Sequence, residues 1–303
     1  MKGIAKDETS GKRTYFYENE TGDAQIVVYE LFTGIEVAYI SVHMDQFDFT
    51  KAEKNFRERY VGFHYCKEGR IEQETDNEFF YLMPGDCSVV MQDKHMKQFS
   101  LPLRHYHGIS IGIDVDIAPD PFAAYLGNDA ITPLKVAKWL CGDGHSTILR
   151  SVEQLKHIFA ESYEVDERLR MDYLKIKLLE LLVVLQQIAL AGVKTTENAV
   201  PRTQAELVKR AAAHISKSIN AKLTLKELSA LFNVSETYLQ SSFRAVYGMP
   251  VISFIRAQKM QSAAQTLIHT NRSVDEIAEE FGYINESKFS AAFKKIMGDS
   301  PST

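Results

Sequence analysis

Two stretches near the carboxyl end of this 303-residue chain repeat one pattern of apolar residues, and the repeat limits the fold more than any other feature. The copies are residues 224–248 and 273–298. Matching positions lie first 49 and then 50 residues apart, so the second copy has one inserted residue. The matched pairs are Leu228 and Ile277, Phe232 and Phe281, Leu239 and Phe289, Phe243 and Phe293, and Gly248 and Gly298. Such a repeat predicts two copies of one supersecondary unit.

Each copy carries the boundary signals of two short helices joined by a tight turn. A Ser or Thr followed by Glu predicts a capping box, a further side-chain oxygen predicts the start of the second helix, and Gly predicts its end. These signals are Thr224 with Glu227, Ser273 with Glu276, Ser235, Asn285, Gly248 and Gly298. The pattern indicates two helix-turn-helix units.

One face of each second helix is polar and is expected to enter the major groove of DNA. The residues expected to contact DNA are Ser235, Glu236, Thr237, Gln240, Ser241, Arg244, Asn285, Ser287, Lys288, Ala291, Lys294 and Lys295. We expect base contacts from Thr237, Gln240 and Lys288, and phosphate contacts from Arg244, Lys294 and Lys295. Residues 250–270 predict a connecting helix, and a spacing of roughly 34 Å would place both second helices in successive major grooves.

Charge is distributed unevenly along the chain. Residues 202–303 hold 13 Lys and Arg against 9 Asp and Glu, whereas residues 1–201 hold 22 against 31. A positive balance in the carboxy-terminal part alone favours an anionic partner for that part. Two alternatives stay open at this point, an inert helical domain and an adaptor whose helices bind another protein.

The carboxy-terminal repeat resembles the AraC/XylS family of transcription regulators over residues 204–303. The resemblance rests on IAEEFGY (277–283), SKFSAAFK (287–294), Gly298 and Pro301 in the second unit, and on Leu228, Ser235, Leu239, Phe243 and Gly248 in the first. It implies a sequence-specific DNA-binding regulator. Ser241 and Ala291 stand where the family often has Arg, the most common reader of guanine, and Lys259 stands for the usual Arg of the connecting helix.

Residues 24–115 predict a β-rich region, because short runs of Val, Ile, Tyr and Phe alternate with Gly, Asp and Pro. Within it, Pro84-Gly85-Asp86 predicts a tight turn after an apolar strand. The region resembles the cupin-like barrel of many family members, which implies a closed barrel that encloses a small-molecule effector. The residues expected to line that site are Phe63, His64, Tyr65, Tyr81, His95, His105 and His107.

A metal-dependent cupin enzyme with an accessory helical domain is the alternative function. His105 and His107 would share one face of a strand, and His64 and His95 could join them. A catalytic cupin site also needs a nearby carboxylate, whereas Asp114 falls on the opposite face of that strand. We therefore expect no catalytic residue, no metal and no cofactor.

Residues 121–192 predict helices beside the barrel. The segment 167–191 is apolar on nearly every side in its second half, which requires burial inside the domain or against a second subunit. We favour a homodimer seam, although internal packing explains the pattern equally well. Its apolar run is too short and too polar for a bilayer, the amino terminus does not resemble a signal peptide, and the three cysteines lack paired spacing. These features predict a cytoplasmic protein without membrane contact.

Together these features predict an α+β multidomain chain, with a cupin-like β-barrel, flanking helices and an all-α double helix-turn-helix. We expect a ligand-sensing barrel at residues 1–120, a helical dimerisation segment at 121–192, a linker at 193–203 and a DNA-binding domain at 204–303. The expected partners are double-stranded DNA, a small-molecule effector, a second copy of the chain and, as a candidate, RNA polymerase.

Overall fold

The computed structural model describes most of the chain. The described residues are 4–9, 11–44, 47, 60–74, 78–92, 99–118, 132–142, 146–192, 199–219, 223–297 and 300–301. His95, Gly298 and most of the predicted linker lie outside them. The chain divides into two compact units, Met1–Ala199 and Val200–Thr303, and each is considered by itself.

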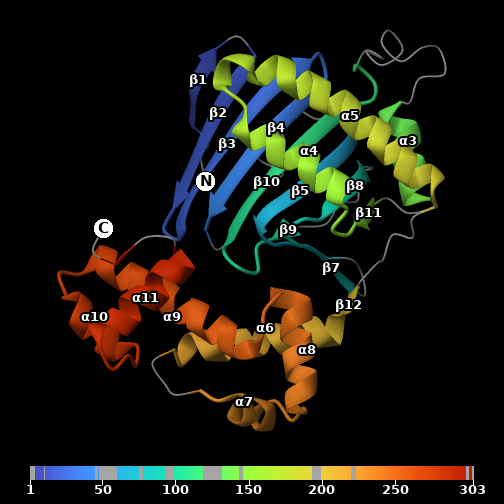
Figure 1. Ribbon diagram of the computed structural model, residues 1–303. Coiled ribbons are helices and arrows are strands. Elements are labelled where there is room, and N and C mark those ends of the chain that lie inside the picture. The colour runs from blue at the N-terminus through green and yellow to red at the C-terminus, as the bar shows by residue number, and fades with distance from the viewer. Residues whose placement is uncertain are drawn as a thin grey trace. The chain divides into compact units, whose positions relative to one another are not determined.

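The first unit is built on a large antiparallel sheet (Figure 1). Its strands follow the spatial order β1 (Ile4–Thr9), β2 (Lys12–Asn19), β3 (Gly22–Phe32), β4 (Ile35–His43), β10 (His105–Asp114), β5 (Tyr60–Gly69), β8 (Cys87–Gln92) and β11 (Ser146–Leu149). Three strands of a second sheet follow the order β7 (Glu78–Leu82), β6 (Ile71–Glu74) and β9 (Phe99–Ser100). The β-rich domain is as predicted, but the closed cupin-like barrel is not confirmed, because neither sheet closes on itself within the described residues.

Alternation along the central strand β10 sorts its side chains onto two faces. Ile109, Ile111 and Ile113 are buried in a core shared with the helices of this unit. The intervening Tyr106 and Ser110 face residues of β6 and β7 in the second sheet. The two faces of one strand therefore contribute to two different interiors.

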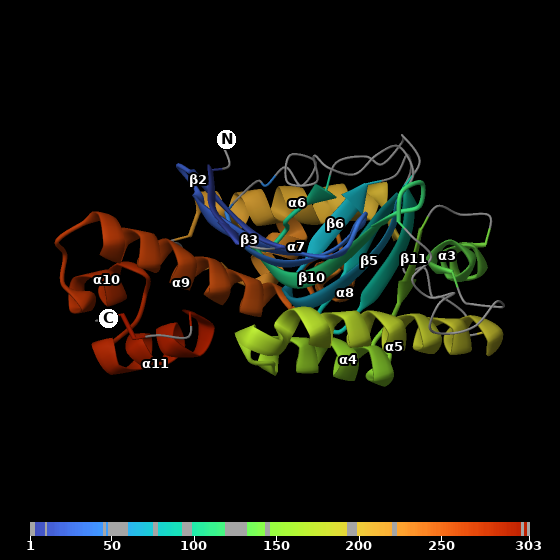
Figure 2. The ribbon, with the colours of Figure 1, turned by 90° about the horizontal axis from the view of Figure 1, so that it is seen from above.

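Helices cover one face of the large sheet (Figures 1 and 2). They are α3 (Pro133–Cys141), α4 (Glu153–Glu164), the short 3₁₀ helix η1 (Glu167–Leu169) and α5 (Arg170–Leu190). The inward residues of α5, including Leu174, Leu178 and Leu181, are almost completely buried. Burial of each such side chain contributes about 2 kcal/mol to the free energy of unfolding. None of the helices in the described part of the chain is both long and apolar enough to span a bilayer.

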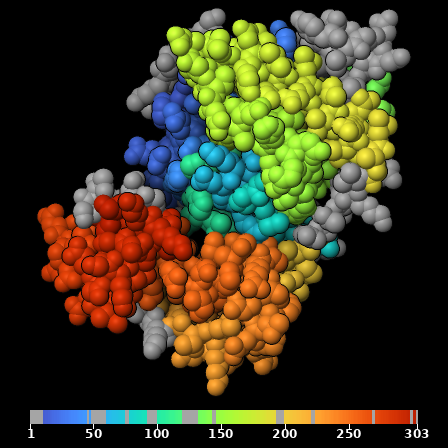
Figure 3. Space-filling view, in the orientation of Figure 1, coloured from blue at the N-terminus to red at the C-terminus, as the bar shows by residue number. Residues whose placement is uncertain are grey.

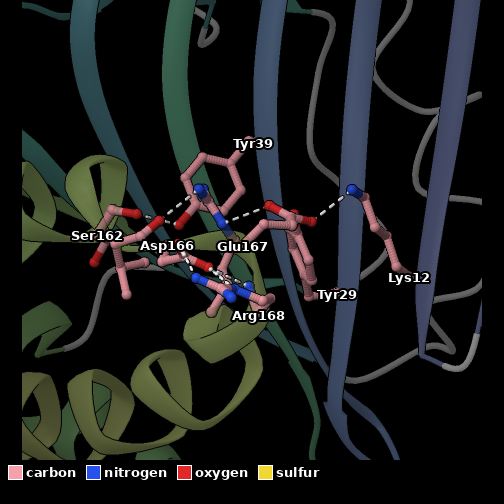
Figure 4. Close-up of polar contacts among 9 residues, drawn as sticks. Lys12, Tyr29, Tyr39, Ser162, Asp166, Glu167 and Arg168 are labelled. Atoms are coloured by element: carbon pink, nitrogen blue, oxygen red, sulfur yellow. Dashed lines mark hydrogen bonds and ion pairs between the residues drawn. The ribbon is translucent and has the colours of Figure 1, made fainter.

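Polar contacts fix the connection between α4 and α5 to the sheet (Figure 4). The Glu167 carboxylate accepts a hydrogen bond from the Tyr29 hydroxyl at 2.9 Å and lies 2.6 Å from the Lys12 ammonium. The Tyr39 hydroxyl donates to the carbonyl of Ser162 at 2.6 Å. These contacts join three strands to one helical hairpin, so the hairpin has a defined position on the sheet.

The predicted turn at Pro84-Gly85-Asp86 is confirmed. The Asp86 amide donates to the Met83 carbonyl at 2.9 Å, which closes a four-residue turn. Gly85, its third residue, has a positive φ of 86°, as a type II turn requires at that position. The Asp86 carboxylate is buried and accepts hydrogen bonds from the amides of Met83 (3.0 Å) and Ser151 (3.2 Å) and from the Arg150 guanidinium. One carboxylate thus joins the turn to the segment before α4.

We expect Asp86→Ala to lower the free energy of unfolding of this unit by about 3 kcal/mol, because it leaves a largely buried Arg150 cation and two amides without their acceptor. Trp139 of α3, the single tryptophan, reports the unfolding of this unit in urea by its fluorescence. Asp23→Ala, which removes an exposed carboxylate from β3, is the matched control. Equal losses in the two variants would contradict the role assigned to Asp86.

The second unit is helical, apart from the two-residue strand β12 (Val200–Pro201). Its helices are α6 (Arg202–Lys217), α7 (Leu225–Leu231), α8 (Glu236–Tyr247), α9 (Val251–His269), α10 (Val274–Glu280) and α11 (Glu286–Met297). The predicted pair of helix-turn-helix units is confirmed as α7–α8 and α10–α11. The predicted connecting helix is α9, and α8, α10 and α11 all contact it.

Candidate nucleic-acid interface and ligand cavity

The first helix-turn-helix unit, α7–α8, presents α8 with one buried face and one exposed face. The Ser235 hydroxyl caps the helix by accepting a hydrogen bond from the Tyr238 amide at 3.1 Å. Phe243 and Tyr247 bury their rings against Phe254 of α9, with ring centroids 5.4 and 4.4 Å from it. The expected DNA contacts that are fully exposed are Ser235, Glu236, Thr237, Ser241 and Arg244. Burial of the aromatic face therefore leaves the polar face available to a partner.

The second helix-turn-helix unit, α10–α11, presents α11 in the same way. The Asn285 side chain accepts a hydrogen bond from the Lys288 amide at 2.9 Å, which caps the start of the helix. Phe289 and Phe293 are buried in a core with α9 and α10. The expected DNA contacts on this helix are all exposed, namely Asn285, Ser287, Lys288, Ala291, Lys294 and Lys295. This face carries three ammonium groups, so it is the more cationic of the two.

Both turns depend on a residue with left-handed backbone geometry. Asn233 has a φ of 53° and Gly282 a φ of 83°, each two residues after the last residue of the preceding helix. The next amide then reaches back into that helix, from Val234 to the Ser229 carbonyl (3.0 Å) and from Tyr283 to the Ala278 carbonyl (2.9 Å). Sequence reasoning did not single out Asn233. Its signal is the tolerance of Asn for this conformation.

Two large exposed side chains beside the predicted contacts were also missed. Tyr238 is 43% exposed on α8, and Ile284 is 90% exposed in the turn before α11. Both are large apolar residues within a helix-turn-helix unit, and residue type alone does not distinguish them from core residues. Both lie at the amino-terminal ends of the helices that carry the expected DNA contacts.

A cavity lies between the two sheets of the amino-terminal unit. It has a volume of about 40 Å³. Its apolar walls are Ile40, Ile71, Phe80, Leu82, Val90, Tyr106 and Ile148, and its polar groups are His64, Gln73, Ser88 and Ser110. Apolar walls with a few polar groups are typical of small-molecule sites.

Among the predicted ligand residues that the structure describes, only His64 lines this cavity. Its Nδ1 lies 2.6 Å from the Ser110 hydroxyl oxygen, and its buried Nε2 has no hydrogen-bond partner. Burial lowers the pKa of this imidazole to about 4. The side chain retains some exposed surface, but both ring nitrogens are shielded from solvent or bonded, so we take the imidazole to be neutral at physiological pH.

The other predicted ligand residues lie elsewhere. Phe63 and Tyr65 alternate with His64 on β5 and therefore face the helices, where the Tyr65 ring stacks on Phe159 at a centroid distance of 4.6 Å. Tyr81 is buried and donates its hydroxyl hydrogen to Glu72 at 2.6 Å. His95 lies outside the described residues.

His105 and His107 lie on the face of the large sheet opposite to His64, because β10 pairs Ser110 with His64. There the Nε2 atoms of His107 and His43 are 2.7 Å apart. Burial and the neighbouring His43 lower the pKa of His107. Nowhere in the described ranges do three His, Cys, Asp or Glu side chains lie together so as to hold a metal ion. Of the histidines weighed for a cupin metal site, His64 thus lies on one face of the sheet and His105 and His107 on the other.

Comparisons with known proteins match the carboxy-terminal part of the chain. Residues 228–303 match the family described as a helix-turn-helix domain. Over 90 residues the chain is 32% identical to the MmsAB operon regulatory protein of Pseudomonas aeruginosa. That match covers 30% of this chain and 29% of the MmsAB regulatory protein. Over 99 residues it is 28% identical to the HTH-type transcriptional activator AarP of Providencia stuartii. That match covers 33% of this chain and 73% of AarP. The carboxy-terminal domain is an AraC-type helix-turn-helix domain.

The curated relatives match only about a third of this chain. The first three curated relatives are matched over 31%, 29% and 50% of their own lengths. Among solved structures, the C-terminal domain of AraT, a response regulator from Geobacillus stearothermophilus, is 37% identical. That match covers 32% of this chain and 80% of the AraT chain, with a TM-score of 0.30.

Gln240 has a structural contact within the AraC-type domain that the sequence did not suggest. It is only partly exposed, and its Oε1 accepts a hydrogen bond from the Val251 amide at 3.2 Å. Val251 is the first residue of α9, whose first amides lack partners within the helix. Gln240 therefore caps α9, and its expected base contact stays a prediction.

Lys259 holds the second helix-turn-helix unit of the AraC-type domain to the connecting helix. Its ammonium donates to the Phe281 carbonyl at 3.1 Å, at the carboxyl end of α10. A cation at that end is favourable because the last carbonyls of a helix lack partners. Burial lowers the pKa of the Lys259 ammonium.

We expect Lys259→Met to lower the local stability of α10 and α11 by about 1 to 3 kcal/mol, because the Phe281 carbonyl loses its charged donor. Hydrogen exchange of the amides in α10 and α11 measures this loss directly. Arg210→Met, which replaces an exposed cation on α6, is the control and should leave the exchange rates of α10 and α11 unchanged. Unaltered protection in Lys259→Met would show that the contact contributes nothing.

Proposed function

We propose that this chain is a sequence-specific DNA-binding transcription regulator controlled by a small-molecule effector. One observation carries the proposal. Two helix pairs with the same caps and the same left-handed turn bury their aromatic faces on one connecting helix and leave two polar helix faces exposed. A polar second helix with a free amino-terminal half is the geometry that enters a major groove. The similarity to regulatory proteins over this domain supports the same function.

The exposed side chains divide by chemistry into two expected roles. Lys294 and Lys295 lie near the carboxyl end of α11, where a flexible ammonium suits phosphate oxygens. Lys288 lies near its amino end, where side chains reach base edges. Arg244 takes the phosphate role on α8. Glu236 and Glu286 begin the two helices and would repel phosphates, so the helix starts are expected to point at base edges rather than at the backbone.

We expect Lys295→Ala to weaken binding to every DNA sequence by a similar factor and to flatten the slope of log affinity against log salt by about one, because one phosphate contact is lost. Lys288→Ala should instead reduce the preference for a duplex that the unaltered chain has selected from a random library. Fluorescence anisotropy at several salt concentrations measures both effects. Lys138→Ala, which removes an exposed cation from α3, is the control. Identical behaviour of the Lys288 and Lys295 variants would contradict this division of roles.

The cavity of the amino-terminal unit supports control by a small molecule. It lies between two sheets, it is apolar, and His64 supplies a buried nitrogen without a partner. A ligand changes DNA binding only if it has different affinities for two states of the chain. We therefore expect the effector to fill this cavity in one state better than in the other.

The outer surface of α5 supports a homodimer. Leu169, Ile176, Val183 and Leu190 are 63%, 62%, 44% and 73% exposed and recur every seven residues (Figure 3 shows the surface of α4 and α5). Side chains seven residues apart lie on one face of a helix, and an exposed apolar stripe of this kind marks a protein interaction site. The opposite side of α5 is buried on the sheet, so internal packing accounts for that side only. We propose that a second copy of the chain covers the exposed stripe.

We expect Ile176→Glu to convert the dimer into a monomer of 34.4 kDa, because a carboxylate would be buried in the centre of the stripe. Light scattering coupled to size-exclusion chromatography measures the mass. Lys135→Glu, on the exposed surface of α3, makes a larger change in charge and should leave the dimer intact. A monomeric unaltered chain would refute the stripe as a dimer interface.

A further inference from the structure

Small residues hollow out the face of the large sheet that borders the cavity. Ser110 and Ser88 lie directly opposite His64 on the two neighbouring strands, so one imidazole stands between two short side chains. Gly62 and Gly112 pair in the next row on the same face. A Cβ atom on Gly62 would lie 2.6 Å from the Nε2 of His64. The hollow and the place of the imidazole in it therefore follow from small residues on three strands, β5, β8 and β10.

His64 is the unsatisfied polar group of this cavity. Among the described residues that line it, only His64 has a buried side-chain nitrogen or oxygen without a hydrogen-bond partner. A buried polar group without a partner is unfavourable, so such a group is commonly completed by water or a ligand. Because burial lowers the pKa of this imidazole, the group that completes it meets a neutral ring.

No residue that lines the cavity in the described part of the chain carries a formal charge at neutral pH. The nearest charged neighbours in sequence, Arg70 and Glu72, alternate with the cavity residues Ile71 and Gln73 and so face away from it. Glu72 accepts hydrogen bonds from Tyr81 and Ser100. A charged ligand would therefore be desolvated without a counter-charge, at a cost of several kcal/mol.

We propose that this cavity binds an uncharged, mainly apolar molecule with one hydroxyl or carbonyl group, and that this group pairs with His64. The inference rests on the proposed function in taking this cavity as the effector site. It excludes carboxylates, amines and phosphates because the described wall residues supply no counter-charge. It also excludes sugars, because His64, Gln73, Ser88 and Ser110 are too few to pair with a ring of hydroxyl groups.

The volume of about 40 Å³ sets the expected size of this molecule. One bound water requires roughly 10 to 15 Å³ on the same measure, so the cavity has room for several water-sized groups. Short alkyl chains therefore fit with small side-chain shifts, and longer ones require the sheets to separate. A series of straight-chain alcohols measures this limit.

Binding is tested on the full chain at neutral pH by calorimetry and ligand-observed NMR. The probes are n-butanol, n-hexanol and n-octanol, with hexanoate, hexylamine and glucose as matched charged and polar comparisons. We expect saturable binding of at least one alcohol and no binding of the charged compounds or of glucose. Hexanoate or hexylamine binding as tightly as n-hexanol, or no alcohol binding at all, would overturn the proposal.

Variants locate the binding in this cavity. His64→Phe keeps a ring of similar size and removes the nitrogen, and we expect it to weaken alcohol binding by about five- to tenfold, the value of one hydrogen bond. His214→Phe, in α6 of the other unit, is the matched control. Val90→Trp fills the cavity and should abolish binding, which keeps the test available if His64→Phe does not fold. Unchanged alcohol binding in the folded variants would overturn the proposal.

The DNA assay separates this inference from the proposed function. If n-hexanol binds in a His64-dependent way and leaves DNA affinity unchanged, the ligand class stands and effector control fails. If DNA binding is as expected and no alcohol binds, the ligand class fails and the DNA-binding function stands.

Discussion

One-sided burial of the two recognition helices, α8 and α11, is the constraint on which the carboxy-terminal unit depends. Each helix fixes an aromatic pair, Phe243 with Tyr247 and Phe289 with Phe293, in a core that includes α9. Burying a Phe contributes about 2 to 3 kcal/mol, so neither helix can rotate its polar face inward without losing most of its stability. The exposed polar faces are thus a consequence of the core, and the caps and left-handed turns only set where each helix begins.

A second one-sided element organises the amino-terminal unit. Strand β10 sends isoleucines into the helix-covered core from one face, and serine and glycine toward the second sheet from the other. The same strand therefore anchors the helical hairpin and leaves room for a cavity. Movement of β10 is a physical route by which a ligand near His64 could alter the α4–α5 hairpin, because the inward side of α5 packs in the core that β10 completes.

Much of the carboxy-terminal unit was predictable because its signals are local. Capping boxes, caps and the four-residue spacing of aromatic side chains act within one or two helical turns, and Thr224, Ser273, Ser235 and Asn285 all cap as expected. The ligand site was much less predictable. Seven residues were expected there, yet among those that the structure describes only His64 lines the cavity, because Phe63, Tyr65, His105 and His107 fall on the other face of the sheet.

The sequence by itself determined the paired helix-turn-helix units, the connecting helix and the β-rich character of the first unit, since repeats, caps and strand patterns are written in neighbouring residues. Only the tertiary structure decided that neither sheet closes within the described residues, that Gln240 caps α9, and that Lys259 holds the end of α10. It also decided which face of β5 borders a cavity. These features depend on strand order and on contacts between residues far apart in the chain, which no local pattern encodes.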